Sequence, residues 1–75
     1  MTKLKKLSRH KLVKVLSKKG FVAKRQKGSH VILVKESERI GCTVPLHKEL
    51  KIGTLKGVLR QIRISEDEFM EWVKE

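Results

Sequence analysis

The segment His30–Lys35, HVILVK, constrains the fold more than any other part of this chain. It is rich in β-branched residues and apolar on both faces, a pattern typical of a strand at the centre of a sheet. A Gly-Ser turn at residues 28–29 precedes it, and residues 21–26, FVAKRQ, alternate apolar and polar side chains before that turn. These features together predict two antiparallel strands joined by a short turn.

A third strand is predicted at residues 42–46, CTVPL, after a polar turn at residues 36–41. Pro45 has no N–H to donate to a neighbouring strand, so this strand belongs at a sheet edge or Pro45 belongs at a strand end. Three strands connected by short turns are expected to form an antiparallel meander.

A helix is predicted before the strands. Ser8 is expected to be its N-cap, with Leu7 and Leu12 forming a hydrophobic staple, and Gly20 is expected to end it. The apolar positions 12, 15 and 16 recur at the spacing of one helical face.

Two further helices are predicted after the strands. Thr54 is expected to be the N-cap of the first, and Gly57 inside it is interpreted as allowing close packing on the sheet. The second is short; Ser65 and Glu68 have capping-box spacing, and Phe69 is expected to face the core with Trp72 and Val73. The apolar stripe of the first of these helices consists of Leu55, Val58, Leu59 and Ile62.

The resulting order is α-β-β-β-α with an extra short C-terminal helix. We therefore predict an α+β fold in which helices cover one face of a three-stranded sheet, a two-layer sandwich. The double-stranded-RNA-binding domain has the same order of elements. The length of the chain leaves room for one core, so residues 1–75 are expected to form a single domain.

The charge of the chain is large and unevenly distributed. The formal net charge is +11, and residues 1–35 contain twelve Lys and Arg but no Asp or Glu. A solvated surface is the alternative reading, yet so uncompensated a run favours a nucleic acid partner. The only aromatic residues, Phe21, Phe69 and Trp72, are interpreted as core, so recognition is expected through phosphates, sugars and helical shape.

Several classes of protein are not supported by the sequence. The single cysteine, Cys42, cannot form an intramolecular disulfide, and His10, His30 and His47 share no metal-ligand spacing. No cofactor or metal is therefore expected, and neither a phosphate-binding loop nor a membrane span is predicted. The N-terminal segment lacks the pattern of a signal peptide, so a cytoplasmic location is predicted.

His30 is the candidate catalytic residue, although a histidine after a Gly-Ser turn is also compatible with a structural role. Imidazole transfers protons near neutral pH, and RNA carries its own nucleophile in the 2′-OH group. Arg25 and Lys27 could neutralise the phosphate, and Gly28 would let the backbone approach it closely. These residues permit a ribonuclease without singling one out.

Two segments resemble the HicA toxin family: KGSH at residues 27–30 and TVPLHKELKIGTLKGVLRQIRISEDEF at residues 43–69. The resemblance implies a double-stranded-RNA-binding-like fold, mRNA interferase activity and a HicB antitoxin partner. It places the family's catalytic histidine on His30, while Val31 and Ile32 stand where many members have a second histidine or a polar residue. His47 matches a common family position and is interpreted as a solvated loop histidine.

The predicted function is therefore that of a metal-independent endoribonuclease toxin of a type II toxin–antitoxin system, with His30 as the catalytic residue. The expected RNA-binding residues are Arg25, Lys27, Gly28 and Ser29. The alternative is a non-catalytic RNA-binding module of the same fold. A helical DNA-binding protein is a third possibility, which the strand pattern of residues 21–46 disfavours.

Overall fold

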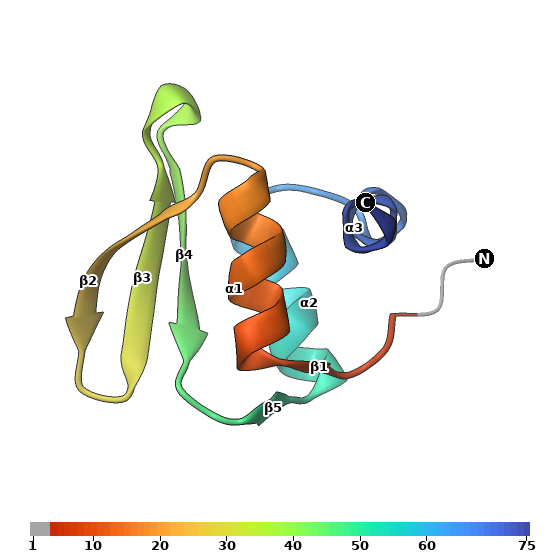
Figure 1. Cartoon of the computed structure of the whole chain (residues 1–75), viewed down its shortest axis with the longest axis horizontal. Coiled ribbons are helices and arrows are strands. Elements are labelled where there is room, and N and C mark those ends of the chain that lie inside the picture. The colour runs from red at the N-terminus through yellow and green to blue at the C-terminus, as the bar shows by residue number, and fades with distance from the viewer. Residues whose placement is uncertain (1–3) are drawn as a thin grey trace.

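The computed structural model describes residues 4–75 of the chain (Figure 1). Its elements are β1 (Leu7–Ser8), α1 (Arg9–Lys18), β2 (Val22–Lys27), β3 (His30–Lys35), the 3₁₀ helix η1 (Glu36–Glu38), β4 (Ile40–Pro45), β5 (Glu49–Leu50), α2 (Ile52–Gln61) and α3 (Glu66–Lys74). This order confirms the predicted α-β-β-β-α arrangement and the extra C-terminal helix. The two-residue strands β1 and β5 were not predicted; they pair with each other in an antiparallel ladder.

The main sheet has the strand order β2-β3-β4, and both pairs of strands are antiparallel. This arrangement confirms the meander and the central position of β3. Pro45 is the last residue of the edge strand β4, where its missing N–H leaves no neighbouring carbonyl unpaired. The outer edge of β4 is covered in part by α2, because the Thr43 N–H donates a hydrogen bond to Gln61 Oε1 at 2.9 Å.

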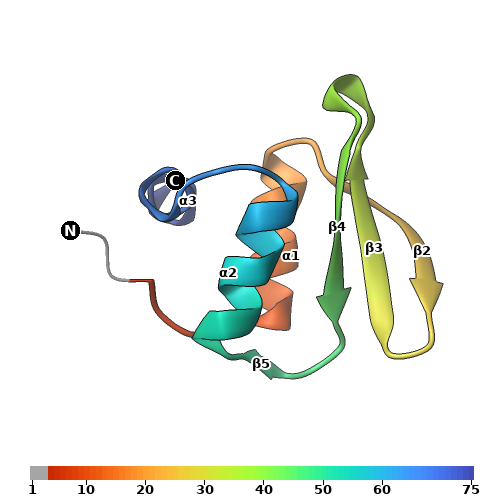
Figure 2. The ribbon, with the colours of Figure 1, turned by 180° about the vertical axis from the view of Figure 1, so that it is seen from behind.

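One face of the sheet packs against α1 and α2, and the other face is open. Figures 1 and 2 show α1 and α2 side by side next to the sheet, with α3 on their far side. The core lies between these layers, and Leu33 of β3 and Val44 of β4 are fully buried in it. The helices contribute Leu12, Val15, Leu16, Leu55, Val58, Leu59 and Phe69 to the same cluster.

Strand β2 extends beyond the helices, and all six of its residues are exposed. A β-bulge interrupts its pairing with β3 between Ala23 and Arg25. Uninterrupted pairing would place Lys24 opposite the buried Leu33. The bulge leaves Lys24 unpaired and puts Ala23 opposite Leu33 instead, so no lysine has to be buried.

The predicted N-caps of the first and third helices are confirmed. Ser8 Oγ accepts a hydrogen bond from the Lys11 N–H, and Ser65 Oγ accepts one from the Glu68 N–H, both at 3.0 Å. Each hydroxyl satisfies a donor that the helix itself leaves without a partner.

Two predictions about the second helix were wrong. The helix begins at Ile52 with Lys51 as its N-cap and no side-chain capping bond, so Thr54 lies inside it. The reason is that Leu50 pairs with Leu7 and is buried, which brings the chain into position for a helix immediately afterwards. Gly57 does not serve close packing, since a Cβ atom there would meet nothing within 4 Å.

Helix α1 ends in a Schellman motif. The N–H groups of Gly20 and Phe21 donate to the carbonyls of Ser17 and Leu16, both at 3.1 Å. Gly20 has a φ angle of +97°, which explains why a glycine stands here. The predicted end of the first helix is thereby confirmed.

Helix α2 ends in the same motif without a glycine. The N–H groups of Arg63 and Ile64 donate to the carbonyls of Arg60 and Leu59 at 3.3 and 3.2 Å. Arg63 occupies the left-handed position with a φ angle of +60°. A residue with a side chain is strained in this conformation by roughly 1–2 kcal/mol.

We expect Arg63→Gly to raise the free energy of unfolding by roughly 0.5–1 kcal/mol, because glycine adopts this φ angle without strain but gains entropy in the unfolded chain. Gly20→Ala tests the same motif in the opposite direction and should lower stability by about 1 kcal/mol or more. Urea denaturation at unchanged m-value measures both. A lower midpoint for Arg63→Gly would mean that the arginine side chain itself stabilises the connection to α3.

Candidate functional site

The Gly-Ser turn places Lys27 and His30 directly opposite each other, as the last residue of β2 and the first of β3. Gly28 has a φ angle of +59° and Ser29 does not have a positive φ. This combination is the pattern of a type II′ turn, which favours glycine at its first central position. The turn chemistry therefore fixes which residue of β2 lies beside His30.

Cross-strand partners lie on the same face of a sheet, so the register assigns the predicted site residues to one face. Lys27 pairs with His30, and Arg25 pairs with Ile32. All of them alternate with the buried Leu33 and therefore lie on the side away from the helices. This surface, here called the open face, consists of Val22, Arg25, Lys27, His30, Ile32, Val34, Gly41, Thr43 and Pro45.

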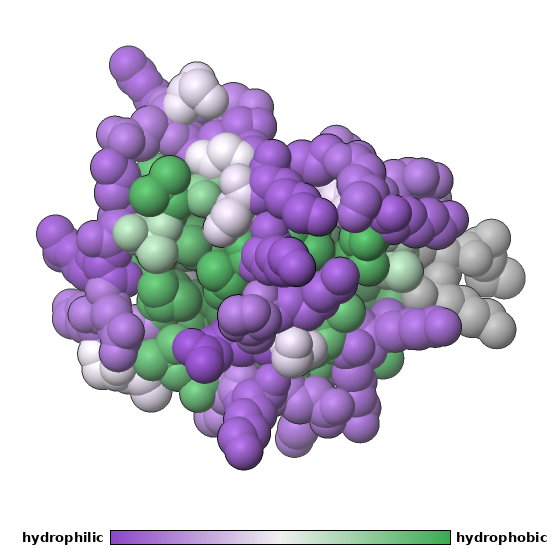
Figure 3. All heavy atoms as spheres, in the orientation of Figure 1, coloured by the Kyte–Doolittle hydropathy of each residue, from purple (hydrophilic) through white to green (hydrophobic). Residues whose placement is uncertain are grey.

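The structure thus brings together the residues that the sequence singled out. The side chains of Arg25, Lys27 and His30 are exposed on the open face, and the turn residues Gly28 and Ser29 adjoin them. A Cβ atom on Gly28 would meet nothing within 4 Å, so the turn leaves free space next to the backbone. In Figure 3, hydrophilic residues surround the outline of the molecule, and apolar residues reach the surface over the sheet.

Acidic residues neutralise the far end of the hairpin and not the end that carries His30. Lys24 forms an ion pair with Glu36, and Lys35 forms one with Glu38, both at 2.8 Å. The hydrogen bond and charge of Lys24 lower the pKa of Glu36. Helix η1, which carries both acids, lies at the opposite end of the sheet from the Gly-Ser turn (Figure 1).

Within residues 4–75, Arg25 and Lys27 form no ion pair, whereas Lys24 and Lys35 do. The positive charge that remains uncompensated on the hairpin therefore lies beside His30. A field of this kind attracts an anion to the histidine and not to the far end of the sheet.

The aromatic side chains are confirmed as part of the core. Phe21 and Phe69 are buried, and Trp72 is partly buried against the core cluster. The Lys19 ammonium lies 5.4 Å from the centre of a Trp72 ring and forms an ion pair with Glu75 at 2.6 Å. These contacts hold α3 against the end of α1. The open face therefore presents no Phe, Tyr or Trp ring on which a base could stack.

The other two histidines are also exposed; His10 lies in the first turn of α1 and His47 in the connection between β4 and β5. Within the described residues, no three His, Cys, Asp or Glu side chains are grouped closely enough to bind a metal ion. The same residues include no helix long and apolar enough to cross a membrane.

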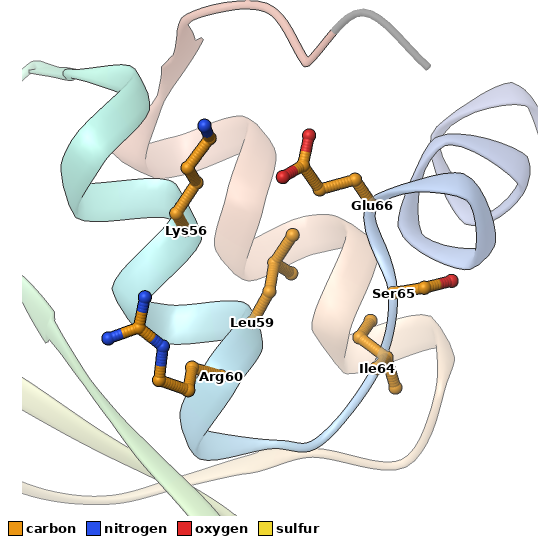
Figure 4. Close-up of a pocket in the computed structure, with 6 residues that line it drawn as sticks. All are labelled: Lys56, Leu59, Arg60, Ile64, Ser65 and Glu66. Carbon is orange, nitrogen blue, oxygen red and sulfur yellow. The ribbon is translucent and has the colours of Figure 1, made fainter. Parts of the chain in front are cut away.

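A pocket of about 290 Å³ lies elsewhere, between α2 and the start of α3 (Figure 4). Lys56 and Arg60 of α2 and the Glu66 carboxylate surround an apolar floor that includes Leu59. Neither the pocket nor the basic residues of α2 were singled out from the sequence. No residue of the Gly-Ser-His turn contributes to its lining, so it is separate from the open face.

A family model described as HicA toxin of bacterial toxin-antitoxin matches residues 9–64, which extend from α1 past the end of α2. The chain belongs to the HicA toxin family. The resemblance of the two motifs is thereby confirmed, and membership assigns this HicA protein the role of toxin in a toxin–antitoxin system with an antitoxin partner. No curated protein sequence matches the chain. Helix α3 lies beyond the matched residues.

We expect Cys42 to be chemically inert in the folded protein. It is buried on the covered face, and this burial raises the pKa of its thiol to about 11. Because the thiolate is the reactive form, alkylation near neutral pH should be at least ~100-fold slower than in the unfolded chain. Iodoacetamide labelling followed by mass spectrometry, with and without guanidinium chloride, measures this ratio. Rapid labelling of the native protein would contradict the burial of β4.

Proposed function

We propose that this toxin is an endoribonuclease, an mRNA interferase, that cleaves RNA by acid–base catalysis at His30. The observation that carries the proposal is the pairing of His30 with Lys27 across the Gly-Ser turn, on an exposed face with uncompensated positive charge. Toxicity by RNA cleavage requires access of a large polyanion to a proton-transfer group, and this arrangement offers that access.

In the proposed reaction the His30 imidazole removes the proton of an RNA 2′-OH group, and the 2′-oxygen attacks the adjacent phosphorus. Lys27 and Arg25 stabilise the negative charge that develops on the phosphate oxygens. The products are a 2′,3′-cyclic phosphate and a free 5′-OH. The nucleophile comes from the substrate, so the proposal assigns no step to a metal ion.

The position of His30 suits catalysis because it begins the central strand of the sheet. A strand with a neighbour on each side holds a side chain in a more constant position than a loop does. The backbone of His30 is constrained by Lys27 on one side and Pro45 on the other. Its side chain, in contrast, is exposed and free to meet a substrate.

We propose that the RNA is held mainly through its backbone. Arg25 and Lys27 would contact phosphates, and the open space at Gly28 together with the Ser29 hydroxyl would admit the sugar-phosphate chain. The covered aromatic rings argue against base stacking as the source of affinity. This binding mode gives a strong dependence on salt and little dependence on sequence.

The antitoxin that the family implies is proposed to be of the HicB type and to cover the open face. Acidic groups would associate rapidly with a chain of net charge +11, because opposite charges steer the encounter. A partner that covers Arg25, Lys27 and His30 would exclude RNA from the site. In a complex of this kind His30 is shielded from solvent and RNA binding is lost.

The alternative function is that of a non-catalytic RNA-binding module. Its supporting observations are the same basic open face and the same fold, so binding experiments do not separate the two. The proposals differ in the role of His30, which only the enzyme requires.

We expect His30→Ala to lower the rate of RNA cleavage by roughly 10²–10⁴-fold, the usual contribution of a positioned proton-transfer group. Fold and RNA affinity should remain nearly unchanged, because the side chain is exposed and the cations beside it remain. The assay follows a labelled mRNA in excess EDTA and analyses the 5′ fragment for a 2′,3′-cyclic phosphate.

Cleavage by His30→Ala at the wild-type rate would remove His30 from the reaction, whereas RNA binding without cleavage by the folded wild type would favour the binding module. Loss of wild-type activity in EDTA, with recovery on adding Mg²⁺, would instead show that the cleavage reaction depends on a metal ion. Circular dichroism of the variant controls for unfolding.

RNA affinity should fall linearly with salt on a logarithmic plot, and we expect Arg25→Ala and Lys27→Ala each to reduce the slope by roughly 0.7–0.9. Each substitution removes one phosphate contact. Lys74→Ala is the matched control, because this lysine lies in α3, on the far side of the helices from the sheet (Figure 2). All three substitutions are made in the His30→Ala protein, so that the RNA is not cleaved while filter binding measures its affinity. Equal slopes for all three variants would place the RNA on another surface.

A further inference from the structure

The connection between β4 and β5 is held at two points, one on each side of His47. The Leu46 N–H donates to the Ser29 carbonyl at 2.7 Å, and the Arg9 N–H donates to the Lys48 carbonyl at 3.1 Å. The first bond joins the connection to the Gly-Ser turn, and the second joins it to the start of α1. His47 is therefore placed beside the proposed catalytic turn by backbone contacts and is not in a free loop.

The ladder between β3 and β4 gives the position of His47 relative to His30. His30 and Pro45 are paired, and the bond from Leu46 to Ser29 continues the ladder by one further residue. Along β4, alternate N–H groups point toward β3 and away from it. The Thr43 N–H points away, to Gln61, and Pro45 at the next such position has no N–H, which agrees with the Leu46 N–H pointing toward Ser29.

His47 lies two residues beyond Pro45, between the end of β4 and a bend at Lys48. Because Pro45 is paired with His30 and Leu46 is bonded to Ser29, His47 lies near the end of the sheet that carries the Gly-Ser turn. Both side chains are exposed. Two exposed imidazoles at the same end of the sheet can act on one phosphodiester group, with one ring near the 2′-oxygen and the other near the 5′-oxygen.

We propose that His47 is the second proton-transfer group, the general acid that protonates the leaving 5′-oxygen. This inference rests on the proposed ribonuclease function and completes its proton balance. His30 takes the proton of the 2′-OH, the new bond between the 2′-oxygen and phosphorus forms, and the bond between phosphorus and the 5′-oxygen breaks. The His47 imidazolium gives its proton to that oxygen, and exchange with water restores both histidines.

Other groups fit this role less well. The acids of η1 lie at the opposite end of the sheet, and those of α3 lie beyond α1 and α2 (Figures 1 and 2). Glu49 is in β5, which pairs with β1 and not with the main sheet. Lys27 is paired with His30, but an ammonium group is a weak proton donor near neutral pH. His10 lies in the first turn of α1, outside the Gly-Ser turn and the β4–β5 connection. His10 therefore serves as the matched control.

The test uses two RNA substrates that differ at the bond cleaved by the wild-type protein. One has the ordinary 5′-oxygen; the other has a bridging sulfur in its place, which leaves as a thiolate and needs no protonation. We expect His47→Ala to cleave the ordinary RNA roughly 10²–10⁴-fold more slowly than the wild type and the sulfur-containing RNA at nearly the wild-type rate. His30→Ala should be defective on both substrates and His10→Ala on neither.

The outcomes separate this inference from the proposed function. Normal cleavage of ordinary RNA by His47→Ala, while His30→Ala is inactive, overturns the role of His47 and leaves the ribonuclease intact. An equal defect of His47→Ala on both substrates also overturns it, because a positioning residue would not respond to the leaving group. Failure of the folded wild type to cleave either RNA refutes the proposed function itself. His47→Gln is the second variant if the alanine variant unfolds, with circular dichroism as the check.

Discussion

Burial of Leu33 between the sheet and the helices is the contact on which the site depends. This residue is fully buried at the centre of β3, and its alternation with His30 and Ile32 keeps those two side chains on the open face. A shift of one residue in the pairing would exchange the faces and turn the histidine toward the core. The Gly-Ser turn and the bulge at Lys24 are the two features that make this single register compatible with the charges of β2.

The distribution of charge follows from the same architecture. Acids occupy η1 at one end of the sheet, position 49 in β5, and α3 with the adjoining Glu75 behind the helices, where Glu75 and Trp72 contact Lys19. Glu36, Glu38 and Glu75 form ion pairs with lysines that are remote from the Gly-Ser turn, whereas Arg25 and Lys27 beside His30 form none among the described residues. The cost is self-repulsion in a small domain, which an anionic partner relieves on binding. Helix α3, which buries Phe69 in the core, adds stability behind the helices without covering the open face.

The sequence alone predicted correctly those features that depend on residues only a few positions apart. The turn before β3, the caps at Ser8 and Ser65 and the helix end at Gly20 all belong to this kind, because their hydrogen bonds close within one helical turn or one hairpin. The pairing of Lys27 with His30 in the candidate site could be predicted for the same reason. These residues flank a two-residue turn and are therefore neighbours in any hairpin of this sequence.

The tertiary structure decided what depends on distant segments. The pairing of Leu7 with Leu50 moved the start of α2 ahead of the predicted cap, which local propensity could not anticipate. Hydrogen bonds join the β4–β5 connection, which carries His47, to the Gly-Ser turn and to α1, whereas the sequence predicted a solvated loop here. The sequence by itself thus determined the turn and the strand around His30, because these depend on interactions between nearby residues. The placement of the β4–β5 connection next to that turn was decided by the tertiary structure, because its hydrogen bonds join segments that are distant in the chain.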